Sequence, residues 1–102
     1  EISMGKDTAM ERLTQPLDKQ GSYIVDLTQV SPDPGGCTGE AINRLGRFED
    51  FYEHLLESQR EIPKELQKLR NEGKEKTVTY KELMVKKLNT SHILTLLKRY
   101  GL

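Results

Sequence analysis

The sequence predicts a mainly α-helical fold: one long helix and two short C-terminal helices, with a short extended arm or strand ahead of them. Hydrophobic residues make up 34% of the 102 residues and charged residues 31%, and tryptophan is absent. Scarce apolar surface is used most efficiently by helices that keep one long face in water. Apolar residues recur at alternating spacings of three and four from Leu45 to Leu69, which is the period of such a helix. A capping motif near residue 79 predicts a new helix after a polar linker.

The N-terminal part of the chain lacks this helical period. Residues 1–9 have no periodic pattern, and Met10 followed by ERLT resembles a natural start, so we expect residues 1–9 to be a disordered leader foreign to the natural chain. Residues 10–102 have the length of a single small helical domain. The stretch SYIVDLTQV, Ser22 to Val30, is rich in β-branched residues and alternates in part, which predicts a short strand or extended arm.

The long helix is predicted from one apolar seam. Pro63 lies inside it, and because proline lacks an amide donor and crowds the preceding turn, it either kinks one long helix or begins a second one. Both alternatives remain open. The run ends at Asn71-Glu72-Gly73, where Gly73 is suited to a left-handed cap. The seam consists of Leu45, Phe48, Tyr52, Leu55, Gln59, Ile62, Leu66 and Leu69, widened by Ile42, Phe51 and Leu56.

Two short helices are predicted after the linker at residues 74–76. Thr79 and Glu82 have the T-x-x-E spacing of a capping box, which predicts a helix from Tyr80 to about Leu88. Asn89-Thr90-Ser91 then supplies a turn and a new cap. The last helix, residues 92–100, has a broad apolar face and ends at Gly101. That face consists of Ile93, Leu94, Leu96, Leu97 and Tyr100.

The stretch SPDPGGCTGEAINRL holds the only cysteine, Cys37, in a glycine-rich turn before the long helix. Free amides at a helix start lower a thiol pKa, but a nucleophile also needs a base within reach, and no pattern places His54 or His92 there. GGCTGE lacks the spacing of a phosphate-binding loop. The stretch is instead interpreted as the start of the long helix, with Thr38 as its N-cap. The two histidines have no ligand at metal-binding spacing. We therefore predict no catalytic, cofactor or metal site and no enzyme activity.

Charge is unevenly distributed although the net charge is zero. Residues 1–61 carry 6 basic and 12 acidic side chains, and residues 62–102 carry 10 and 4, so the halves have charges of −6 and +6. This polarity suits a chain that folds back on itself or pairs head to tail with a second copy, and we favour that over a nucleic-acid partner. The nucleic-acid alternative reads residues 78–102 as helix, turn, helix, but the leucine-rich second helix offers few groups for base edges. Its phosphate contacts would be Lys81, Lys86, Lys87, Lys98 and Arg99.

Three segments and the C-terminal ending carry a resemblance to a known group of proteins. The segments are MERLTQP, YIVDL and CTGEAINRLGRFEDFYE. The ending, LQKLRNEGKEKTVTYKELMVKKLNTSHILTLLKRYGL, has the form EGK…V-x-[YF]…YG[LI]. Together these segments resemble small uncharacterised proteins encoded in prophages and other mobile elements of Gram-positive bacteria, over residues 10–102. The resemblance implies a start at Met10 and a location in the cytoplasm of the bacterial host. It supplies no catalytic residues.

The function predicted is that of a non-enzymatic protein–protein interaction or adaptor module that forms a homo-oligomer and acts on a phage or host protein. The alternative is a small DNA-binding or regulatory module that uses the basic C-terminal helices. No run of about 18 apolar residues is present, so no membrane partner is expected. The predicted interface consists of Leu45, Phe48, Tyr52, Leu55, Ile62, Leu66 and Leu69.

Overall fold

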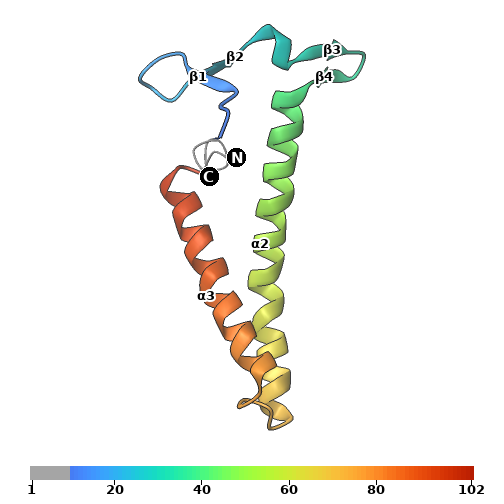
Figure 1. The fold of residues 1–102 in the computed structure, drawn as a ribbon, viewed down its shortest axis with the longest axis vertical. Coiled ribbons are helices and arrows are strands. Elements are labelled where there is room, and N and C mark those ends of the chain that lie inside the picture. Colours follow the sequence, from blue (N-terminus) through green and yellow to red (C-terminus); the bar gives the residue numbers. More distant parts are fainter. Residues whose placement is uncertain (1–9) are drawn as a thin grey trace, which may run out of the picture. The chain divides into compact units, whose positions relative to one another are not determined.

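The computed structural model describes residues 10–102, and the predicted leader at residues 1–9 lies outside the described residues (Figure 1). Contacts divide the chain into two units, an N-terminal unit that ends at Phe48 and a C-terminal unit, Glu49–Leu102. One helix, α2, runs from the first unit into the second. The elements in order are β1 (Thr14–Pro16), β2 (Tyr23–Val25), the 3-10 helix η1 (Leu27–Gln29), β3 (Ser31–Asp33), β4 (Gly36–Thr38), α2 (Glu40–Asn71) and α3 (Val78–Arg99).

The first hairpin of the N-terminal unit pairs β1 with β2. Asp18 organises its turn, because its side chain accepts hydrogen bonds from the amides of Gln20 at 2.8 Å and Ser22 at 3.2 Å. These amides stabilise the ionised carboxylate and hold the pKa of Asp18 below its usual value. The predicted strand in residues 22–30 is present as β2, three residues long. The register is Thr14 opposite Val25, Gln15 opposite Ile24 and Pro16 opposite Tyr23.

The second hairpin, β3–β4, occupies the stretch that we expected to lead directly into the long helix. Pro34 and Gly35 form its turn, in which proline pre-sets the φ angle that the first turn position needs. Thr38 is the last residue of β4, so the prediction that Thr38 caps the long helix is wrong. The helix begins after Gly39, at Glu40.

Gly39 lets the chain pass from β4 into α2 while it lies against η1. Its φ angle is +125°, and a Cβ at this position would collide with the backbone carbonyl of Gln29. Asp26 caps η1, because its carboxylate accepts hydrogen bonds from the amide of Thr28 at 3.0 Å and from the hydroxyl of Thr28 at 3.1 Å. These bonds lower the pKa of Asp26. Local hydrogen bonds and turn geometry therefore hold the N-terminal unit.

In the C-terminal unit, α2 continues through Pro63, which excludes the alternative that a second helix begins there. Because Pro63 has no amide hydrogen, the carbonyl of Gln59 lacks its intrahelical donor. Pro63 and Gln59 are both exposed, so water can donate a hydrogen bond to this carbonyl instead. The helix ends at Asn71 and is capped by Gly73, where φ is +70°. The amide of Gly73 donates a hydrogen bond to the carbonyl of Arg70, and the amide of Lys74 donates one to the carbonyl of Leu69. This is a Schellman motif, and it confirms the predicted Gly73 cap.

A short turn brings α3 back along α2 as an antiparallel helical hairpin (Figure 1). The cap of α3 is Thr77, whose hydroxyl accepts a hydrogen bond from the amide of Tyr80 at 3.3 Å and donates one to the carbonyl of Lys74 at 2.7 Å. The predicted capping box at Thr79 is therefore wrong, because Thr79 lies inside the helix. Arg70 joins the two helices, with Nε 2.8 Å from the Tyr80 hydroxyl.

The prediction of two short C-terminal helices is also wrong, since residues 78–99 form one helix of 22 residues. Asn89-Thr90-Ser91 makes no turn. Thr90 is buried, and the carbonyl of Ser91 accepts a hydrogen bond from the hydroxyl of Thr95 at 2.9 Å. The low helix propensity of these residues is a weak preference, and burial on the same side as Leu94 overrides it. The predicted end at Gly101 is confirmed by a second Schellman motif, with φ at +82°.

The buried side chains among residues 10–102 all lie in the C-terminal unit. Those on α2 are three or four residues apart and so share one face of the helix. On α3 the two buried residues are also four apart. These residues are Leu55, Ser58, Ile62 and Leu66 of α2 and Thr90 and Leu94 of α3. The core is therefore a narrow strip between two helices.

Candidate interaction surface

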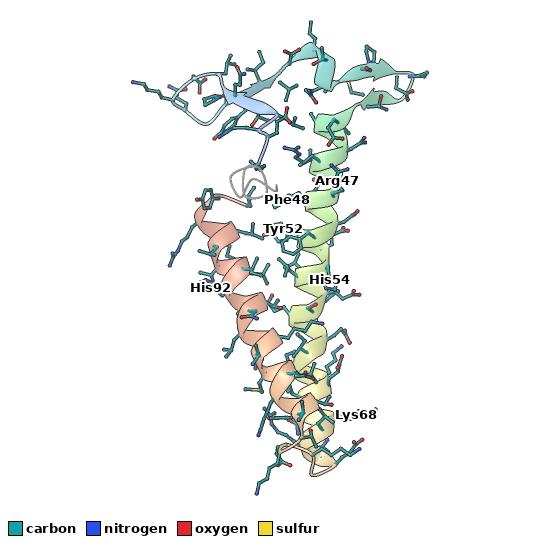
Figure 2. The ribbon with its side chains drawn as sticks, viewed as in Figure 1. Arg47, Phe48, Tyr52, His54, Lys68 and His92 are labelled. Carbon is teal, nitrogen blue, oxygen red and sulfur yellow. The ribbon has the colours of Figure 1, made fainter. Side chains whose placement is uncertain are left out.

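The seam predicted as the interface is mostly covered within the chain. Leu55, Ile62 and Leu66 are buried, and Leu69 is half-buried. Phe48 and Tyr52 are also half-buried, and Figure 2 shows Tyr52 on the side of α2 that faces α3. Leu45 is the most open of the set, with 52% of its surface exposed. Most of the predicted interface therefore forms the interior of the helical hairpin.

A second apolar face lies on the opposite side of α3. We call this face the outer stripe; it consists of Val78, Val85, Leu88 and Leu96. Their exposed fractions are 71%, 56%, 66% and 38%, respectively. Spacings of seven, three and eight residues place them on one side of a helix with 3.6 residues per turn. That side is roughly half a turn away from Thr90 and Leu94. Helix α3 is therefore apolar on two sides, and α2 covers only one of them.

Charged side chains lie beside the apolar residues of the outer stripe. Val78, Lys81, Glu82 and Val85 line a shallow hollow of about 300 Å³. Arg99 follows Val85 by fourteen residues, a whole number of heptads, so it extends the same side. Figure 2 shows His92, which falls between Leu88 and Leu96, on the side of α3 away from α2.

The outer side of α2 has the opposite charge. A broader hollow of about 720 Å³ lies along this helix. Four of the residues that line it, Asp50, Glu53, Leu56 and Glu57, are called the acidic face. Leu56 is 45% exposed. The hollow is lined by Asp50, Glu53, His54, Leu56, Glu57, Gln59 and Arg60.

The residues considered for catalysis and metal binding are separate. Cys37 is exposed on β4, opposite Pro32 in the second hairpin. His54 lies on α2 and His92 on α3. Among residues 10–102 no three His, Cys, Asp or Glu side chains are grouped so that they hold a metal ion. The acidic side chains near His54 come from a single helix.

The basic residues named for nucleic-acid contact are all exposed but do not share a face. Lys81 and Arg99 lie on the side of the outer stripe, whereas Lys87 and Lys98 lie seven residues before and four after Leu94, on the opposite side. Lys86 points between these sides. Since α3 is one helix, the helix–turn–helix on which the nucleic-acid alternative depended is absent from the described residues.

Sequence reasoning missed the outer stripe. Its heptad-like spacing is visible in the sequence, but the predicted break at residues 89–91 divided it between two helices. No described helix is long and apolar enough to cross a membrane. No protein-family model, curated protein or solved structure is significantly similar to this chain.

Proposed function

We propose that this chain is a non-enzymatic, helical protein–protein interaction module that associates with itself through the outer stripe of α3. The observation that carries the proposal is the two-sided apolar character of α3. Thr90 and Leu94 on one side are buried in the hairpin, while Val85 and Leu88 on the other are more than half exposed.

The outer stripe does not serve the fold of the described chain. A helix that packs on one neighbour needs a single apolar side, and its other side is normally polar. Contiguous apolar surface that stays exposed is typical of a surface that binds another protein. An interface needs such an apolar centre with polar groups at its rim, and here Lys81, Glu82 and Arg99 border the apolar residues.

Light scattering on the purified chain tests the proposal. We expect the average mass to rise with concentration up to about 100 μM, as expected for association in the micromolar range. The V85Q/L88Q variant, which removes the centre of the stripe but keeps good helix formers, should remain monomeric with unchanged helix content.

The matched control is L17Q/L27Q, which removes two exposed leucines from the N-terminal unit, where they are 62% and 87% exposed. This variant should associate like the unmodified chain. An unmodified chain that stays monomeric throughout the concentration range would contradict the proposed function. So would a V85Q/L88Q variant that associates as strongly as the unmodified chain.

A further inference from the structure

We infer that the surface that covers the outer stripe is the acidic face of α2 in a second copy, so that copies associate head to tail. This inference rests on the proposed self-association and names the surface that receives the stripe. It differs from the simplest dimer, in which two α3 helices meet about a two-fold axis.

Charge is the first argument. Residues 78–99 carry five basic side chains and one acidic side chain, a net charge of +4. Residues 49–61 carry five acidic side chains and one arginine, a net charge of −4 with histidine neutral. A contact between two α3 helices therefore brings like charges together, whereas α3 on α2 of another copy joins opposite charges.

Apart from Glu61, these charged side chains form no ion pair among the described residues. The ion pairs among residues 10–102 join Arg47 to Glu40, Lys64 to Glu61 and Lys74 to Glu72, and none connects α2 to α3. The side chains of Lys81 and Arg99 beside the stripe, and of Glu53 and Glu57 on the acidic face, make no ion pair in the described structure. They are available to a second chain.

The position of the two faces is the second argument. Glu53 and Glu57 each lie two residues from the buried Leu55, which at 3.6 residues per turn places them on the opposite side of α2, just as the outer stripe lies opposite the buried residues of α3. Arg60 and Lys64 follow them by seven residues and share their side of the helix. The helical hairpin is therefore a two-helix layer with a basic, apolar side on α3 and a side on α2 that is acidic from Asp50 to Glu57 and carries Arg60 and Lys64 further along. Stacking one layer on the next places α3 of one copy on α2 of another, where Leu56 supplies an apolar contact for Val85 and Leu88.

Such a contact is heterologous, because it joins two different faces, and a mixing experiment identifies it. The first variant, V85Q/L88Q, lacks the stripe and keeps the acidic face. The second, E53Q/L56Q/E57Q, lacks the acidic face and keeps the stripe. Circular dichroism first verifies that each retains the helix content of the unmodified chain.

We expect each variant alone to be monomeric at concentrations at which the unmodified chain associates, with affinity reduced by about tenfold or more. An equimolar mixture should form a complex of two chains, since one variant offers the stripe and the other the acidic face. The control E72Q/E75Q removes two carboxylates from the interhelical turn and should associate normally. Raising the salt from about 50 mM to about 500 mM should weaken the association, because salt screens the opposite charges.

Two results would overturn this inference while leaving the proposed function intact. One is an E53Q/L56Q/E57Q variant that associates like the unmodified chain, which would indicate that two stripes meet directly. The other is a mixture of the two variants that stays monomeric. Failure of the unmodified chain to associate would overturn both proposals.

Discussion

Different interactions stabilise each of the two units of this chain. Every buried side chain among residues 10–102 lies in the C-terminal unit. In the N-terminal unit β1–β4 are three residues each. The β1–β2 turn depends on the Asp18 carboxylate, η1 on the Asp26 carboxylate and the passage from β4 into α2 on Gly39. One unit thus depends on apolar packing along two helices, and the other on local backbone geometry. The two should respond differently to mutation and to pH.

Removing a core side chain should have the largest effect. Leu66 is only 1% exposed, so Leu66→Ala removes apolar contacts and leaves a cavity, with an expected loss of about 2–5 kcal/mol in the free energy of unfolding. Urea denaturation followed by circular dichroism measures this loss. Leu88→Ala on the outer stripe should change it by less than about 0.5 kcal/mol at a concentration at which the chain is monomeric. Equal losses in both variants would contradict the division of α3 into two faces.

A methyl group at Gly39 should disturb the N-terminal unit alone. Gly39→Ala forces a side chain into a positive φ angle and against the carbonyl of Gln29, at a local cost of about 1–3 kcal/mol. Hydrogen exchange should show loss of protection in β3 and β4 with α3 unchanged. In Gly35→Ala the new methyl meets open space, and its exchange pattern should resemble that of the unmodified chain. Loss of protection in α3 as well would show that the two units unfold together.

The cap of α3 distinguishes the observed helix start from the predicted one. Thr77→Ala removes the hydroxyl that accepts the amide of Tyr80, which should cost about 1 kcal/mol in the free energy of unfolding. Thr79→Ala, at the position where a cap was predicted, should cost less than about 0.5 kcal/mol, because alanine is a better helix former than threonine. A larger loss at Thr79 than at Thr77 would place the start of α3 where the sequence analysis expected it.

Acid should loosen the N-terminal unit by a small amount. The pKa of Asp18 lies below the unperturbed 3.8 because the amides of Gln20 and Ser22 favour its ionised form. A lowered pKa means that this stabilisation is present above pH 3.8 and is lost as the pH falls through the lowered value. NMR titration of the amides of Gln20 and Ser22 should show a common midpoint below pH 3.8. A midpoint at or above this value would show that the turn does not depend on the carboxylate.

Local signals in the sequence located some elements correctly and misled on others. Gly73 and Gly101 mark helix ends because the left-handed conformation at these positions is strained for other residues. Asn89-Thr90-Ser91 predicted a turn, but Thr90 is buried on α3 and the helix continues. Pro34-Gly35 is a strong turn signal, yet the interpretation of the stretch as the start of a helix obscured a two-strand hairpin. Helix and turn preferences are small, so packing and pairing partners decide between them.

The candidate site was partly predictable in the same way. The basic residues of α3 and the opposite charges of the two halves of the chain follow directly from the sequence. The apolar seam of α2 is also visible in it, but the sequence did not show that α3 covers Leu55, Ile62 and Leu66 and leaves Val85 and Leu88 exposed. Periodicity identifies which residues share a side of a helix, and it does not identify what lies against that side.

The sequence by itself determined the apolar seam of α2, the glycines that end α2 and α3, the charge asymmetry and the presence of an extended segment before α2, whereas the structure decided that α2 continues through Pro63. These depend on interactions within a few residues or on composition. Only the tertiary structure decided that α3 is continuous and that its two apolar sides have different environments. The physical reason is that burial of an apolar side chain depends on residues far away in the sequence, here those of α2, and that contact also overrides the weak turn preference at residues 89–91.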